Sequence, residues 1–372
     1  MKIAFIHHTL VIGSGIDTVI WELAHRLKGE HDVKIFTFLN EYPSGLVKVV
    51  NIPFNENKVI NSVFSPFLPN SYKLRGLIKE FDVVNVHHYP ANFFPFFPKK
   101  LETFNIVTEW SGPPLSLLKN LSLKEKFYIK FIMAMNKYAA LRADDLIAPC
   151  DFVKKWIKDN YGLDSRKIYL DGINFDYFNF KKYKKEKIDF GGPIILYVGR
   201  IAPNKNIDIL IESFETVKRE LEDSKLVIVG RKTFPEYYKK LKNFLKKRKL
   251  EESVIFTGEV SWDDLPLYYA SCDVFATCSA WEGFLRAEAF AMKKPMVAFD
   301  AGANKETIKD GINGFLVKEK SPEAFANALI KILEDNNLRK KMGKNGYKWA
   351  KENLDFDVIA KNFSKYITEV TN

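Results

Sequence analysis

One segment in the second half of the chain combines two fixed positive charges with the start of a helix. Residues 199–206 read GRIAPNKN and lead from an apolar run into an amphipathic stretch over 207–220. Asn204 or Asn206 can cap that helix, whose free N–H groups and dipole favour an anion. Arg200 offers a planar fork for two phosphate oxygens and Lys205 adds a point charge. The segment is therefore suited to a diphosphate, with an ordinary strand end and a surface lysine as the alternative.

A second segment carries two carboxylates in apolar surroundings. Residues 278–292 read CSAWEGFLRAEAFAM and lie between two predicted strands, with Glu282 in the loop and Glu288 in the first turns of the next helix. Paired acids on an exposed face are commonly just solvated. Here the apolar residues Trp281, Phe284, Ala287 and Phe290 make that reading less favourable. The two carboxylates can reach opposite ends of one ligand.

The elements that must position these residues follow an alternating pattern of strands and helices, typical of parallel sheets with crossover helices. In the first half, strands are predicted at 2–7, 33–38, 82–86, 106–109 and 146–149, and helices at 17–28, 71–80, 123–141 and 152–161. In the second half, strands are predicted at 194–198, 225–229, 254–257, 274–277, 296–299 and 314–317. Their helices should begin near residues 206, 235, 262, 285, 304 and 322.

The length of 372 residues and a lysine-rich linker that ends in Gly191, Gly192 and Pro193 divide the chain into two α/β domains. We expect one Rossmann-like domain over 1–182 and a second one over 193–352. A C-terminal helix over 353–372 is expected to pack back on the first domain. In open parallel sheets ligands bind at the carboxyl ends of the strands, so two such sheets should face each other across a cleft that holds the site.

Bulk composition limits the class of protein. The formal charge of +11 favours polyanions, but the lysines are spread over helix faces and no zinc-finger or aromatic RNA-binding pattern is present, so nucleic acid is not an expected partner. Three cysteines without C-x-x-C spacing argue against a disulfide framework and a zinc site, which suits a reducing cytoplasm. The first residues read as a strand and not as a signal peptide, and no apolar run reaches about 18 residues.

Taken together, these motifs resemble those of the retaining glycosyltransferases of family 4, which adopt the GT-B fold. Residues 200–205 resemble the family's G-R-x-x-x-x-K motif together with Gly199, and residues 282–288 resemble its paired-glutamate motif. Further similar segments are 226–230 (LVIVG), 254–260 (VIFTGEV) and 310–317 (DGINGFLV). The likeness covers nearly the whole chain and is strongest over 194–317.

The resemblance implies a metal-independent hexosyltransferase that uses a nucleoside-diphosphate sugar as substrate and needs no cofactor. Arg200 and Lys205 would hold the donor diphosphate, Glu282 would contact the transferred sugar, and Glu288 would accept hydrogen bonds from the ribose. The resemblance assigns further donor contacts to Val260, Gly15, Phe284 and Leu285. Sugar would pass from a UDP or GDP donor to a hydroxyl acceptor, in glycan, glycolipid or polysaccharide synthesis. The leaving phosphate would help to deprotonate the acceptor.

The sequence departs from the family pattern in two places. Seven residues usually separate the two glutamates, whereas five separate Glu282 and Glu288, so this loop is two residues shorter than in the family. Many relatives also carry an acceptor-side histidine after the strand at 106–109, where this chain has Trp110. His87 and His88, at the end of the strand at 82–86, are the nearest substitutes.

Other activities lack their motifs. The only D-x-D, Asp355-Phe356-Asp357, begins the last predicted helix and is better explained by helix capping than by a metal. A P-loop and the G-x-G-x-x-G of a nicotinamide dehydrogenase are both missing. A catalytically silent sensor or scaffold that binds nucleotide sugars stays open, supported by the short glutamate loop.

Contact with a membrane is a further hypothesis. The segment 121–141, which contains the predicted helix at 123–141, combines lysines with an apolar stripe. The segment 93–98 (FFPFFP) concentrates aromatic residues. Such a surface could rest on anionic lipid at the inner face of the membrane and meet a lipid-linked acceptor. Alternatively, both segments belong to the core of the first domain or line the pocket of a soluble acceptor.

Overall fold

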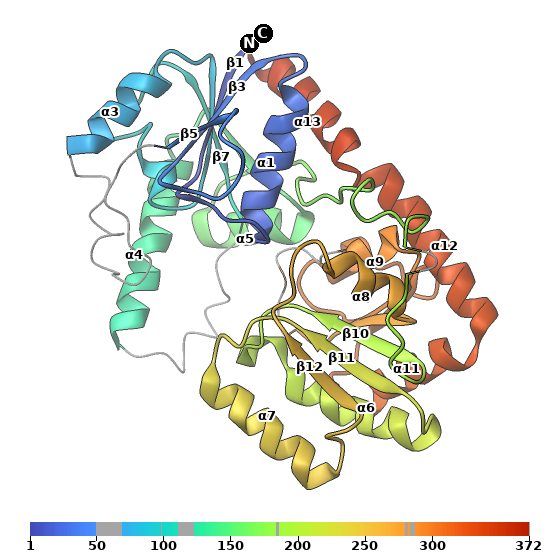
Figure 1. The fold of residues 1–372 in the computed structure, drawn as a ribbon. Coiled ribbons are helices and arrows are strands. Elements are labelled where there is room, and N and C mark those ends of the chain that lie inside the picture. The colour runs from blue at the N-terminus through green and yellow to red at the C-terminus, as the bar shows by residue number, and fades with distance from the viewer. Residues whose placement is uncertain are drawn as a thin grey trace. The chain divides into compact units, whose positions relative to one another are not determined.

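The structure is a computed structural model that describes residues 1–49, 69–97, 99–110, 123–183, 186–279, 282 and 287–371. The chain forms two compact units (Figure 1). The first unit combines Met1–Gly172 with Phe356–Asn372, and the second is Ile173–Asp355.

The first unit is built on a parallel sheet with the order β5-β3-β1-β6-β7-β8-β9. Its strands are β1 (Lys2–Ile6), β3 (Asp32–Thr37), β5 (Val47–Val49), β6 (Val83–His87), β7 (Phe104–Thr108), β8 (Asp145–Ala148) and β9 (Arg166–Lys167). The chain runs from β1 to β3 on one side and later to β6 on the other side. The strand order therefore reverses between β1 and β6, which lie in register with Ile3 opposite Val83 and Phe5 opposite Asn85.

Five helices accompany this sheet in the described part of the unit. They are α1 (Gly15–Leu27), α3 (Pro69–Ile78), α4 (Leu123–Ala140), α5 (Asp151–Tyr161) and α13 (Phe356–Thr371). Alternate strand residues such as Ile3 and Phe5 of β1 form a buried face against α1 and α13. On α13, Phe356 and Phe363 are buried in this cluster, so the end of the chain completes the core of the first unit.

The second unit contains a parallel sheet with the order β12-β11-β10-β13-β14-β15. Its strands are β10 (Ile194–Val198), β11 (Lys225–Val229), β12 (Val254–Gly258), β13 (Val274–Thr277), β14 (Met296–Phe299) and β15 (Gly314–Val317). Here the order reverses between β10 and β13. The central strands of both sheets are nearly continuous runs of apolar residues, as expected for parallel strands that are covered on both faces.

Helices of the second unit cover its sheet. They are α6 (Ile207–Glu220), α7 (Pro235–Arg248), α8 (Leu265–Ser271), α9 (Glu288–Ala291), α10 (Asn304–Thr307), α11 (Pro322–Glu334) and α12 (Asn336–Asn353). Helices α6, α7 and α11 lie on one face and α8 on the other (Figure 1). Leu210 and Phe214 of α6, Leu241 of α7 and Phe325 of α11 are buried in one cluster with the strands.

The expected two parallel-sheet α/β domains of a GT-B protein are confirmed. The first unit ends earlier than the expected boundary at residue 182. The amide of Ile173 donates to the carbonyl of Leu354 at 2.7 Å, and the rings of Phe175 and Tyr347 pack edge to face. These contacts tie the chain after Gly172 to the second unit.

Two elements suggested for the membrane surface differ in exposure. Phe93, Phe94 and Phe96 are buried, which agrees with the alternative that these aromatic residues belong to the core of the first unit. On α4, by contrast, Leu123 is 85% exposed and Phe127 is 74% exposed. Within the residues that the structure describes, no helix has the length and hydropathy needed to cross a membrane.

Candidate functional site

The predicted diphosphate segment and the predicted glutamate loop meet in the second unit. The first follows β10 and the second follows β13, and these two strands are neighbours at the point where the sheet order reverses. The carboxyl ends of such strands form the crevice in which open α/β sheets bind their ligands. The sequence motifs therefore lie where the topology alone would place a site.

Lys205 and Glu282 are in direct contact across this point. The ammonium Nζ of Lys205 donates to Oε1 of Glu282 at 2.6 Å, and the two side chains are 16% and 18% exposed. A charge-assisted hydrogen bond between two partly buried side chains restricts both of them. The pair thus presents a cation and a carboxylate at one position.

A glycine in the loop after β14 makes the position of Glu282 possible. The amide of Ala303 donates to the carbonyl of Glu282 at 3.0 Å, and a Cβ added to Gly302 would lie only 2.2 Å from the same carbonyl oxygen. Gly302 also has φ +58°, a left-handed backbone that side chains disfavour. Three consecutive strands of the sheet, β10, β13 and β14, therefore contribute loops to the arrangement around Glu282.

The side chains of Asn206 and Tyr197 hold the loop that carries Arg200. Asn206 lies at the N-cap of α6 with φ 49° and ψ 47°, but it forms no capping hydrogen bond. Its amide instead donates to the carbonyl of Cys278 at 2.9 Å, so the expected capping role was wrong, because the side chain links the two motif loops. The hydroxyl of Tyr197 donates to the carbonyl of Arg200 at 3.1 Å. Arg200 itself is exposed and forms no ion pair within the described ranges.

The remaining donor-side residues are spread along the same edge. Glu288 is buried at the start of α9, and Val260 is half-buried just beyond β12. Phe284 and Leu285 lie outside the described residues, as does Arg286. The structure thus joins Lys205 to Glu282 directly, and Glu288 and Val260 follow strands at the same edge of the sheet.

In the first unit, His87 and His88 have different surroundings. His87 ends β6 and is fully buried, with its ring stacked on those of Phe5 and Trp110. The indole Nε1 of Trp110 donates to Nδ1 of His87 at 3.0 Å. The tryptophan at the position where relatives were expected to carry a histidine therefore fixes His87. Burial and the neighbouring His7 and His88 keep the pKa of His87 well below its ordinary value.

His88 is partly exposed and sits in an unusual backbone conformation, with φ 35°. Its carbonyl accepts from the amide of Asn92 at 3.0 Å. The amide of the next residue, Tyr89, donates to Oδ1 of the buried Asn136 on α4 at 3.1 Å, and the side chain of Asn92 donates to the same oxygen at 2.7 Å. Residues in such conformations persist where the surroundings determine them, and they are frequent at functional sites.

A buried pair beside these histidines was missed by the sequence analysis. Nε2 of His7 lies 3.1 Å from Oδ1 of Asp17, and Oδ2 of Asp17 accepts from the amide of Val11 at 2.7 Å. The signal was available, because His7 continues the alternation of Ile3 and Phe5 and so projects toward α1. Gly15 begins α1 and is exposed at the end of the loop that Asp17 holds.

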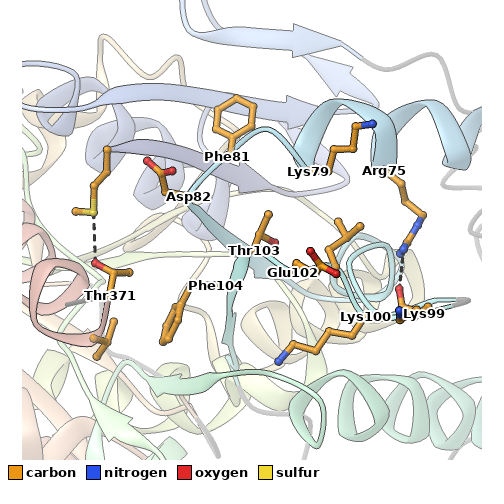
Figure 2. A pocket seen from close by; sticks show the side chains of 13 residues that line it. Arg75, Lys79, Phe81, Asp82, Lys99, Lys100, Glu102, Thr103, Phe104 and Thr371 are labelled. Carbon is orange, nitrogen blue, oxygen red and sulfur yellow. Dashed lines mark hydrogen bonds between the residues drawn. The ribbon is translucent and has the colours of Figure 1, made fainter.

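The amino edge of the first sheet contains a hollow of ≈ 910 Å³, shown in Figure 2. Arg75 lines it and donates from Nη2 to the carbonyl of Lys99 at 2.6 Å, while Thr371 donates to Sδ of Met1 at 3.4 Å. The first contact links α3 to the segment before β7, and the second links α13 to the residue before β1, so both hold the fold together. Ligands of parallel sheets bind at the opposite edge, so this hollow is not the candidate site.

No group of three or more histidine, cysteine, aspartate or glutamate side chains in the described part of the chain is arranged to hold a metal ion. The two aspartates of the D-x-D segment form ion pairs with basic side chains of the protein. Nε of Arg26 on α1 lies 2.6 Å from Oδ1 of Asp357, and Asp355 pairs with Lys351.

Comparison with known proteins places these features in a family. The model for glycosyltransferase family 4 matches residues 13–170, and the model for glycosyl transferases group 1 matches residues 179–349. An uncharacterised glycosyltransferase of Methanocaldococcus jannaschii is 27% identical over 352 residues, which cover 91% of this chain and 90% of the relative.

A second relative has a described activity. The N-acetylgalactosamine-N,N'-diacetylbacillosaminyl-diphospho-undecaprenol 4-alpha-N-acetylgalactosaminyltransferase of Campylobacter jejuni is 29% identical over 324 residues, covering 84% of this chain and 83% of the relative. Among solved structures, HepE of Anabaena in complex with UDP and glucose matches with a TM-score of 0.80 at 20% identity, covering 99% of this chain and 100% of that chain. At this identity, the structural likeness shows that the two chains share a fold.

Proposed function

Because the chain belongs to the family 4 glycosyltransferases and has the GT-B fold, we propose that it transfers a sugar from a nucleoside-diphosphate sugar to a hydroxyl acceptor with retention of configuration. The observation that carries this proposal is the contact of 2.6 Å between Lys205 and Glu282 at the switch point of the second sheet. A nucleotide sugar is anionic at its diphosphate and rich in hydroxyls at its sugar. A cation and a carboxylate side by side suit the junction between these two parts.

In this proposal, each residue of the pair serves one part of the donor. Lys205, with Arg200 from the same loop, neutralises the charge that develops on the departing nucleoside diphosphate. Glu282 accepts hydrogen bonds from the transferred sugar, and the linkage from Gly302 and Ala303 to its carbonyl keeps it in place. Glu288 and Val260 serve the nucleoside. Fixed charges of this kind stabilise the transition state without reorganisation, so the donor chemistry is proposed to proceed without a metal.

The donor is proposed to be of the UDP or GDP type, and the acceptor a hydroxyl in glycan, glycolipid or polysaccharide synthesis. The name of the Campylobacter relative, which includes a diphospho-undecaprenol carrier, supports a lipid-linked acceptor. Leu123 and Phe127 on α4, which are exposed beside Lys126 and Lys130, support peripheral contact with anionic lipid on the cytoplasmic side.

Calorimetry with UDP, GDP and ADP tests the donor site. We expect one of them to bind, and Lys205→Ala or Arg200→Ala to weaken its binding by roughly 1.5–3 kcal/mol, the range of a charge-assisted hydrogen bond. Lys239→Ala, an exposed lysine of α7, is the matched control and should bind like the wild type. Unchanged affinity in both site variants would remove the proposed diphosphate contacts.

Turnover separates transfer from simple binding. With the preferred donor, we expect Glu282→Gln to bind normally but to release nucleoside diphosphate far more slowly, because its contact strengthens as charge develops on the sugar. Glu288→Ala should chiefly raise the KM for the donor. Glu236→Gln, an exposed glutamate of α7, is the control. A wild-type protein that binds donor but never turns it over would favour the silent sensor instead.

A further inference from the structure

The hollow at the amino edge of the first sheet belongs to the first unit, whereas the proposed donor residues belong to the second. Its volume of ≈ 910 Å³ lies within the range of small-molecule sites, roughly 300–1,000 Å³. The hollow is lined by the end of α3, by the segment that leads into β7, by Met1 and by the end of α13. Its two sides differ in chemistry (Figure 2).

One side of the hollow is cationic. Arg75 lies in the last turn of α3, Lys79 follows that helix, and Lys99 comes from the segment before β7. The helix dipole favours basic residues at the C-terminal end of α3, but it does not account for Lys99. Among the side chains that the structure describes, no carboxylate forms an ion pair with any of these three, whereas the neighbouring Lys100 is paired with Asp144. Three positive charges from two segments therefore border one space.

Arg75 keeps part of its hydrogen-bonding capacity for a ligand. Its Nη2 donates to the carbonyl of Lys99 at 2.6 Å, and its Nη1 donates to the carbonyl of Phe94. A guanidinium has five N–H groups, so these two contacts leave donors available while they fix the orientation of the group. Burial lowers the pKa of Arg75 from its ordinary value, and an anion beside it would offset part of that desolvation.

The other side of the hollow contains two half-buried aromatic rings. Phe81 packs edge to face against the buried ring of Phe36, with the ring centroids 5.5 Å apart. Phe104 packs against the core of the first unit, and Val370 of α13 also lines the hollow. Each of the two rings is thus held from behind and keeps a part of its surface open to the hollow.

Two acidic residues also line the hollow. Asp82 lies toward the apolar side, where its Oδ2 accepts from the amide of Lys2 at 2.8 Å (Figure 2). Glu102 lies toward the basic residues, so its single negative charge stands against three positive ones. The cationic side therefore keeps an excess of positive charge.

We propose that this hollow binds an organic phosphate, with the phosphate among Arg75, Lys79 and Lys99 and an apolar body against Phe81 and Phe104. Such a ligand matches both sides at once. An inorganic anion would leave the rings in water, and a neutral apolar molecule would leave the cations unpaired. A nucleotide with its aromatic base and a lipid phosphate with its alkyl chain share this chemistry. The inference does not depend on the proposed transferase activity, because it uses no residue of the donor site.

Calorimetry with phenyl phosphate and octyl phosphate tests the inference, and inorganic phosphate is the probe without an apolar part. We expect both organic phosphates to bind, and inorganic phosphate to bind roughly 10-fold more weakly or less. Lys79→Glu and Lys99→Glu should each raise the Kd of the organic phosphates roughly 5- to 30-fold. Lys73→Glu, at an exposed lysine of α3 that does not line the hollow, makes the same change in net charge and should bind like the wild type. Lys205→Ala should also leave this binding unchanged.

The two organic probes also separate the sources of the ligand. Tighter binding of octyl phosphate indicates a lipid phosphate, and tighter binding of phenyl phosphate indicates a phosphate with an aromatic body, and either result supports the inference. Failure of both to bind, or equal affinity for inorganic phosphate, would overturn it. Loss of binding in Lys205→Ala but not in Lys79→Glu and Lys99→Glu would place the phosphate at the donor site. An equal loss in Lys73→Glu would reveal a general effect of net charge and would also refute the assignment.

Discussion

Acid should destabilise the first unit through His88, by an amount that follows from its pKa. The pKa is about 4 in the folded chain against an ordinary 6.5. Between these values the unfolded chain binds more protons, so stability is lost as the pH falls from about 6.5 to about 4. At pH 5 the linkage amounts to ~2 kcal/mol, against almost nothing at pH 7. Replacing His88 by asparagine, which tolerates a left-handed backbone, should remove this dependence.

The measurement is the free energy of unfolding at pH 7 and pH 5 for wild type and His88→Asn. Urea unfolding that is monitored by hydrogen exchange of peptides from β1 and β6 measures the stability of the first unit separately from that of the second. The loss between the two pH values should be smaller by ~2 kcal/mol in the variant than in the wild type. His25→Asn should not reduce it. Equal losses in His88→Asn and wild type would refute the reasoning that burial holds this ring neutral.

Three further predictions concern other contacts. Gly302→Ala should lower stability by about 1–3 kcal/mol and slow donor turnover, measured by urea unfolding and nucleotide release, because its Cβ would displace the carbonyl of Glu282. Asn136→Leu should lower stability by about 1–3 kcal/mol for each buried donor left unpaired, and heat denaturation at pH 7 checks this. If α4 binds anionic lipid, vesicle flotation at low salt should weaken in Lys130→Glu and persist in Lys239→Glu; equal flotation of both would contradict it.

The sequence predicted the sheet strands closely where the pattern was strong. The apolar runs at 194–198, 225–229 and 274–277 are the observed strands β10, β11 and β13, because buried parallel strands are continuous apolar segments bounded by turns. The helix α12 was not predicted. Its sequence is rich in lysine and asparagine, and its buried side is made of small residues such as Gly343 and Gly346, which carry no hydrophobic periodicity.

The contacts within the candidate site could not be predicted from the sequence. The loop positions of Lys205 and Glu282 followed from their motifs, but their direct pairing depends on which strands are neighbours. The role of Gly302 depends on a backbone approach between segments distant in sequence. Asp17 lies in the first turn of α1, where acidic residues are common, and only the fold brings it to His7.

The division of the first unit between the two ends of the chain determines the order in which the protein can be completed. Residues Ile173–Asp355 form the second unit as one continuous stretch, whereas α13 supplies the final part of the first core. A ribosome releases the residues of α13 only after those of the second unit, so α13 cannot cover the face of Ile3 and Phe5 until the whole of the second unit has been synthesised. The unit whose synthesis starts first is therefore completed after the other one, and its apolar face depends on α13 for protection from aggregation.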